Sequence, residues 1–293
     1  MRTLFFLFVF VNSLLALSPV GEEIICGFDI KSDKKAEKVF SFLENYDFKK
    51  SFFEDWDIIE KESFFKYSYF DTEDLRLYKN SQEALLLEEK KGNGKREFII
   101  FDDLRFKVKR YKKQISFYDK HPLFGSVKRI ERGEFLKKLS SLGIETPLKL
   151  KNLFNLTKIN WEIIIEKDNT PYAIITLQKS VLEDFILDPY FYRLIFKIKA
   201  KEYITLKERL FLEKFLDSLK KEIEKNFSLK SKIYKNEYCA DLDYLKNNVI
   251  FFAFAIKHPT LYYFLFALSI GIIGLAIFFV LFKFFDRKTT ESQ

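Results

Sequence analysis

Two short stretches decide the fold of this chain: SYFDTEDLRLY at residues 68–78 and LRFKVKRY at residues 104–111. The second stretch alternates between apolar and basic residues, so an extended strand places Arg105, Lys107 and Lys109 on one face. The apolar residues between them then occupy the other face. This pattern fits a solvated outer face, and it equally fits the inner face of a barrel whose polar interior holds an anion.

The first stretch resembles a strand and turn of the CYTH and VTC families, the triphosphate tunnel enzymes, in which a basic strand similar to residues 104–110 follows. The segment between the two, residues 79–103, is longer here than in those families. Residues 230–234 (KSKIY) resemble a phrase near the C-terminal end of the family domain, so the likeness extends over most of residues 23–242. The resemblance implies an α+β fold: an antiparallel β-barrel (tunnel) lined by Arg, Lys and Glu, with flanking helices.

The first strand bears on catalysis. Tunnel enzymes hold a divalent metal with glutamates, and the resemblance associates catalytic competence with an E-x-E-x-K first strand. Residues 27–31 read GFDIK, so Lys31 matches, Asp29 is a shortened substitute for the second glutamate, and Gly27 replaces the first. The late strand at residues 193–201 carries lysines where the family has acids. Asp29 is therefore the one candidate metal ligand, which is poor provision for a hard cation.

The basic positions of the family pattern survive better than the acidic ones. The candidate anion-binding residues are Lys31, Arg105, Lys107, Lys109, Lys197, Lys199 and Lys232. Lys158 and the pair at residues 128–129 extend this set. The basic residues form two rows, one at residues 105, 107 and 109 and the other at residues 197, 199 and 201. If both rows faced inward, they would bind a phosphate-bearing polyanion by charge alone, without a metal or other cofactor. Facing outward, they would be ordinary solvated side chains, and the sequence leaves this choice open.

The expected function is therefore binding of a phosphate-bearing or other anionic ligand without catalysis. One alternative is a metal-dependent triphosphatase or polyphosphate polymerase that uses Mg or Mn. Another is an envelope scaffold or assembly protein with an unidentified protein partner. His121 and His258 are isolated, and the chain shows neither a phosphate loop nor a dinucleotide fingerprint. It also shows no compact basic motif, so a nucleic-acid partner is not expected.

The two ends of the chain predict export and anchoring. Residues 1–18 have the pattern of a secretory signal peptide. Residues 261–282 form an apolar run long enough to span a bilayer, so a transmembrane helix is expected at residues 261–283. We expect a tunnel domain at residues 19–245 outside the cytoplasm, a juxtamembrane segment at 246–260, and a short cytoplasmic tail at 284–293. The partner at the anchor is the membrane itself.

Cysteine usage adds one further expectation. Cys26 and Cys239 both belong to the exported body, and an even pair in an oxidising compartment can form a disulfide. The family resemblance places the first strand near the segment that follows the last long helix. Two buried thiols remain the alternative.

Periodicity predicts the remaining elements. Helices are expected at residues 33–46, 134–142 and 206–227, the last with a capping box between Thr205 and Glu208. A turn at Asp168-Asn169 separates two of the strands and indicates a hairpin. The expected strands are residues 23–31, 64–70, 96–101, 104–111, 161–166, 172–178 and 192–199.

Overall fold

The structure is a computed structural model of the 293-residue chain. It describes residues 22–48, 56–91, 94–101, 104–107, 132–146, 149–183, 185, 189–199 and 204–290. The predicted signal peptide, Lys109, His121 and the pair at 128–129 lie outside these ranges. The chain divides into two compact units, residues 1–242 and 243–293, which are described separately below.

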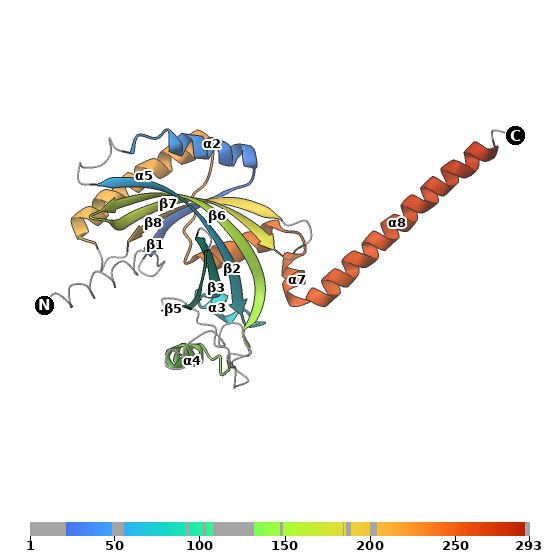
Figure 1. Ribbon diagram of the computed structural model, residues 1–293, viewed down its shortest axis with the longest axis horizontal. Helices are drawn as coiled ribbons and strands as arrows, with labels where there is room; N and C mark the ends of the chain where they lie inside the picture. The colour runs from blue at the N-terminus through green and yellow to red at the C-terminus, as the bar shows by residue number, and fades with distance from the viewer. Residues whose placement is uncertain are drawn as a thin grey trace. The chain divides into compact units, whose positions relative to one another are not determined.

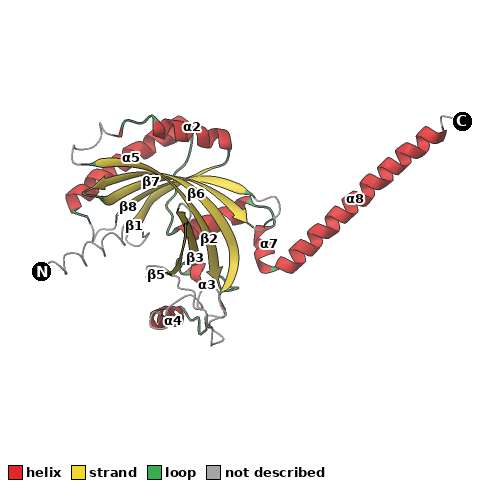
Figure 2. Cartoon of the chain, in the orientation of Figure 1, coloured by secondary structure: helices red, strands yellow, loops and turns green. Residues whose placement is uncertain are grey.

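The first unit is built on an antiparallel sheet (Figures 1 and 2). Its strands follow the order β1-β8-β7-β6-β2-β3-β4-β5. Their bounds are β1 Glu22–Ile30, β2 Asp57–Asp71, β3 Ala84–Lys91, β4 Gly94–Phe101, β5 Leu104–Lys107, β6 Lys151–Lys167, β7 Thr170–Glu183 and β8 Tyr190–Lys199. The predicted α+β class with an antiparallel sheet is confirmed. Within the described ranges the sheet is open rather than closed into a barrel, because β1 and β5 form its two edges.

Two helices cover the outer face of the sheet. These are α2 (Asp33–Glu44) and α5 (Leu206–Phe227), both close to the predicted bounds. Their apolar stripes pack with one face of β1, β8, β7 and β6 in a single buried cluster. The Thr205 side chain accepts from the backbone N–H of Glu208, and the Glu208 side chain accepts from the backbone N–H of Thr205, so the predicted capping box is present.

The hairpin between β6 and β7 turns where the sequence predicts. Asp168 and Asn169 both have positive φ, 51° and 58°, as a tight two-residue turn requires. Both strands are longer than predicted. The strand β3 was not predicted, because its run of ALLLEEKK lacks the alternation that marks a half-buried strand.

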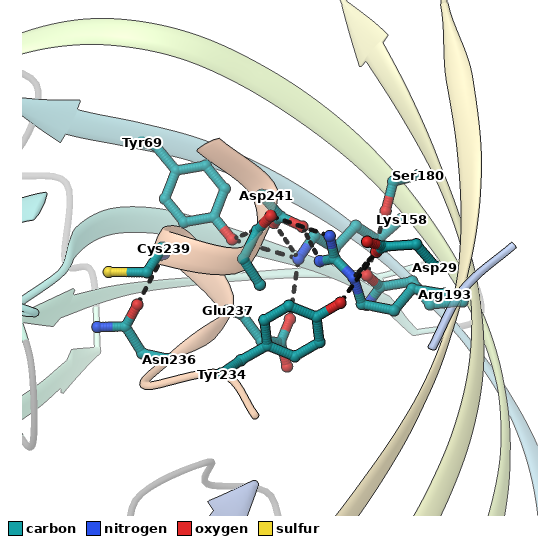
Figure 3. A network of polar contacts seen from close by, with 12 residues as sticks. Asp29, Tyr69, Lys158, Ser180, Arg193, Tyr234, Asn236, Glu237, Cys239 and Asp241 are labelled. Atoms are coloured by element: carbon teal, nitrogen blue, oxygen red, sulfur yellow. Dashed lines mark hydrogen bonds and ion pairs between the residues drawn. The ribbon is translucent and has the colours of Figure 1, made fainter. Parts of the chain in front are cut away.

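Three further helices begin in the first unit. They are α3 (Arg76–Lys79), α4 (Arg132–Ser141) and α6 (Glu237–Asn248). The predicted helix at 134–142 corresponds to α4. The first turn of α6 lies against the inner face of the sheet, opposite α5, and it positions the site described below (Figure 3).

The second unit contains the short helix α7 (Phe252–Lys257) and the long helix α8 (Pro259–Thr290). Within α8, Pro259–Val280 is long and apolar enough to cross a membrane, with a mean hydropathy of 2.5, and it is the one such helix among the described residues. This agrees with the predicted span at residues 261–283. The side of the membrane on which the body lies stays a prediction.

Candidate functional site

The inner face of the sheet gathers basic positions from separate strands. Register pairs Lys158 of β6 with Phe65 of β2, and Phe65 in turn with Glu89 of β3. The same alternation places Arg193 and Lys197 of β8 on this face. At the far edge, Phe98 pairs with Lys107 and Ile100 with Arg105, so the backbone of β5 puts both basic positions on this face too.

Lys158 lies at the centre of this face and is fully buried. Its Nζ lies 2.8 Å from Oε2 of Glu237 and 2.7 Å from Oδ2 of Asp241, and it donates to the hydroxyl of Tyr69 at 3.2 Å. Nζ also lies 4.3 Å from the ring centroid of Tyr67. A buried ammonium is tolerated only where it is paired and hydrogen-bonded, and these contacts meet that requirement.

Arg193 is the second fully buried cation (Figure 3). Its Nε donates to Asp29 at 3.0 Å, its Nη1 to Asp241 at 2.5 Å, and its Nη2 to the carbonyl oxygen of Ala240 at 3.0 Å. Burial opposes its charge, but Asp241 and Asp29 outweigh burial and raise the pKa of the guanidinium above its ordinary value.

The acids that balance these cations come from one turn of α6. Glu237 lies between two lysines, with Oε2 toward Lys158 and Oε1 2.6 Å from Nζ of Lys197. Asp241, one turn later, lies between Lys158 and Arg193 and also accepts from the hydroxyl of Tyr69 at 2.9 Å. Burial opposes ionisation of Glu237, but Lys158 and Lys197 hold its pKa well below the ordinary value.

Asp29 forms a second centre at the edge of the same network. Besides Arg193, it accepts from Lys232 at 2.7 Å and from the hydroxyl of Tyr234 at 3.0 Å. Burial raises the pKa of Asp29, but the charges of Arg193 and Lys232 lower it by more, so the net shift is downward. Backbone hydrogen bonds between Gly27 and Lys232, 2.9 and 2.8 Å, hold this segment along β1.

Gly27 is required by this arrangement. A Cβ at residue 27 would lie 2.6 Å from Cε2 of Tyr234 and 3.2 Å from the carbonyl oxygen of Leu194. The position that the resemblance gives to the first family glutamate therefore lies beneath an aromatic ring, which also covers the guanidinium of Arg193 at 4.9 Å.

The stretch SYFDT has a structural role through Asp71, which is fully buried. Its carboxylate accepts from the backbone N–H groups of Thr72, Leu77 and Tyr78 at 2.7, 2.9 and 3.0 Å. It also accepts from the hydroxyl of Tyr238 at 2.8 Å. Asp71 thus fixes the turn into α3 and ties that turn to the first turn of α6.

Glu83, immediately before β3, lies close to the first turn of α6. Its Oε2 is buried without a hydrogen-bond partner, and the backbone N–H of Tyr238 hydrogen-bonds to the side chain. Burial and the charge of Glu237 raise its pKa to about 7, against the opposing effect of Lys158 and Lys197.

The predicted site residues divide into three groups. Lys197 and Lys232 belong to the network, each paired with an acid. Lys199 lies on β8 with its Nζ 5.6 Å from the ring centroid of Tyr172, and Lys31 is exposed just after β1. The structure describes only the backbone of Arg105 and Lys107 on the edge strand β5. Whether any of them binds an anion stays a prediction.

From the sequence, Lys158, at the centre of the site, was included only as an addition to the basic set, and the residues that surround Lys158 were missed. The sequence pattern places Arg193 in a strand but gives it no role in the site, and it does not single out Glu237 or Asp241. A signal existed, because the two acids stand four residues apart and share one face of a helix. Their partners are distant in sequence, so only the fold brings them together.

The predicted disulfide is not present, which corrects that expectation. Cys26 and Cys239 are both buried thiols. Cys26 packs in the outer core cluster beneath α5, whereas the Cys239 sulfur lies 3.9 Å from the carbonyl oxygen of Tyr78 on the inner side. The sheet separates them. Burial raises the pKa of the Cys26 thiol to about 12.

Among the residues that the structure describes, no group of three or more His, Cys, Asp or Glu side chains is arranged to hold a metal ion. Asp29, the one predicted ligand candidate, is engaged by Arg193, Lys232 and Tyr234.

Comparison with known proteins gives likeness at the level of solved structures only. No family model matches the chain, and no curated protein matches it. A candidate adenylate cyclase from Bacillus halodurans covers 78% of this chain and 99% of its own length, with 17% identity and a TM-score of 0.40. A candidate adenylate cyclase from Vibrio parahaemolyticus covers 76% and 99%, with 11% identity and a TM-score of 0.38. A protein from Pyrococcus horikoshii covers 75% and 97%, with 12% identity and a TM-score of 0.37. Likeness at this level does not identify a function.

Proposed function

We propose that this protein is a membrane-anchored binding module whose body lies outside the cytoplasm and takes up a phosphate-bearing anion without catalysis. The ligand binds on the inner face of the sheet. One observation carries the proposal: register places basic positions of β5, β6 and β8 on a single face. Phosphate oxygens are the natural partners of such a set, because Arg and Lys form charge-assisted hydrogen bonds to them.

The test is titration calorimetry of the full chain in detergent micelles with tripolyphosphate. Each cation that contacts phosphate contributes about 1.5–3 kcal/mol before desolvation is subtracted. Replacing Arg105 and Lys107 together by Gln should therefore weaken binding by about a hundredfold or more. Added salt should weaken binding, and a chelator should leave it unchanged.

A matched control removes the same charge from the other side of the sheet. Lys220→Gln with Lys221→Gln lowers the net charge equally on α5, which covers the outer face. This variant should bind as the parent does. An equal loss of affinity in both double variants would show that binding depends on net charge and not on the inner face.

A second candidate is a scaffold or assembly protein. It is favoured by the observation that Lys158, Arg193 and Lys197 already have carboxylate partners within the chain. The absence of any heat with tripolyphosphate, even after Glu237 and Asp241, the acids that pair these three cations, are replaced by their amides, would select this candidate. The enzyme alternative is tested in the same samples, because release of phosphate that depends on added Mg or Mn would establish it.

A further inference from the structure

The two α6 acids already stand where an anion would have to bind. Glu237 bridges Lys158 and Lys197, and Asp241 bridges Lys158 and Arg193. Lys158 is shared by both acids. The three cations therefore bind a pair of acidic groups one helical turn apart, supplied by the chain itself (Figure 3).

Exchange of these acids for another pair costs little electrostatically. Removing one partner of a buried ion pair is expensive because the other charge stays buried and unpaired. Replacing both carboxylates by two phosphoryl groups leaves each cation paired, so that penalty does not arise. Other contacts also hold the turn: Tyr238 donates its hydroxyl to Asp71, stacks on Tyr69 and Phe154, and hydrogen-bonds through its backbone N–H to Glu83. Asn236 donates to the carbonyl oxygen of Ser81, and Arg193 donates to that of Ala240. Ligand binding has to outweigh the loss of these contacts.

We propose that the first turn of α6 is an internal competitor for the anion site. Glu237 and Asp241 occupy the cations in the unliganded protein, and this turn leaves the inner face when the ligand binds. The inference rests on the proposed function and adds to it a ligand class. An anion that replaces both acids must carry at least two neighbouring acidic groups, as tripolyphosphate does and orthophosphate does not.

The chain carries its own reporter for this movement. Cys239 lies within the same turn and is buried, whereas Cys26 is buried on the opposite side of the sheet. Departure of the turn exposes Cys239 alone, while global unfolding exposes both thiols. Alkylation followed by peptide mass spectrometry of the full chain distinguishes the two events.

The labelling experiment compares three additions at equal ionic strength. Saturating tripolyphosphate should accelerate alkylation of Cys239 about fivefold or more, because the protected form is depleted, and should leave Cys26 unlabelled. Orthophosphate and sodium chloride should leave both thiols protected, because buried pairs are screened little by salt. Binding of tripolyphosphate without any change at Cys239 would overturn the competitor while leaving the proposed function intact.

A variant gives the second, independent readout. Glu237→Gln with Asp241→Asn keeps the shape of the turn but removes its charge, so tripolyphosphate should bind at least about tenfold more tightly. The matched control is Asp217→Asn with Glu222→Gln on α5, which changes net charge equally and should not alter the affinity. Equal affinity in the parent and in a folded Glu237/Asp241 variant would also overturn the inference. If that variant fails to fold, the labelling of the parent protein decides the matter alone.

Absence of binding to both the parent and the folded Glu237/Asp241 variant rejects the proposed function and the competitor together. Binding by the variant alone supports the competitor and shows that the α6 acids suppress the site in the isolated protein. Binding to the parent with unchanged labelling rejects only the competitor. The two proposals therefore fail in different ways.

Discussion

Glu83 and Glu237 show how neighbouring residues of one type acquire opposite properties in this domain. Glu237 is held ionised by Lys158 and Lys197, whereas burial and the charge of Glu237 raise the pKa of Glu83 to about 7. Between the ordinary glutamate pKa, about 4.5, and about 7, the folded protein binds a proton at Glu83 that the unfolded chain does not. Stability from this residue is therefore full below about pH 4.5 and is lost as pH rises through about 7.

Glu83→Gln should remove this part of the pH dependence. The free energy of unfolding of the parent should contain a component that falls between about pH 5 and pH 8, at no more than about 1.4 kcal/mol per pH unit. The variant should lack that component. Urea denaturation followed by fluorescence reports on the body alone, because both tryptophans, Trp56 and Trp161, lie in the first unit. The same change between pH 5 and pH 8 in both proteins would contradict the assignment.

The carboxyls with lowered pKa act in a different pH range. Asp29 and Glu237 contribute stability that is present above their unfolded pKa values and is lost as pH falls through the folded ones. Their effect therefore belongs below about pH 4.5. Measurements between pH 5 and pH 8 isolate Glu83 from them.

At the scale of elements, Asp71 joins the end of β2, the helix α3 and the first turn of α6. Asp71→Ala leaves several buried donors without an acceptor, each worth about 1–3 kcal/mol. The variant should lose about 3 kcal/mol or more of unfolding free energy, measured by urea denaturation. Asp74→Asn, three residues further on in an exposed position, should leave the unfolding midpoint unchanged. Similar midpoints for Asp71→Ala and the parent would show that these hydrogen bonds are not needed.

The sequence predicted those elements whose signal is local. The apolar stripe of α5, its capping box and the β6–β7 turn are all contained in short windows, so pattern and propensity found them. β3 was missed because its residues do not alternate. The pairing of Glu237 and Asp241 with Lys158 joins positions about eighty residues apart, and no local pattern encodes such a contact. The basic rows were found because they repeat along single strands.

At the scale of the whole molecule, α6 belongs to both units. Its first turn carries the acids of the inner face, and its last residues, 243–248, belong to the unit that contains α8. The residues that neutralise the site and the helix that can cross a membrane are thus separated by a short length of chain.

Topology is the prediction at this scale. Protease added to intact spheroplasts that carry the protein should digest the body and spare a fragment containing α8 and the tail, because the body is expected outside. After detergent lysis the tail should be cleaved as well. Complete protection of the body in intact spheroplasts would reverse the proposed placement.

The packing of Tyr234 over Gly27 has a consequence for how such a chain can evolve. No side chain larger than hydrogen fits at residue 27 while that ring is in place, so one substitution alone cannot introduce an acid there without moving the ring. Loss of the ring first would remove the Asp29 hydrogen bond and uncover Arg193. Both orders of the two mutations pass through a destabilised intermediate. A lineage that has acquired this pair therefore faces a barrier to placing an acidic residue at this position, whatever selection favours later.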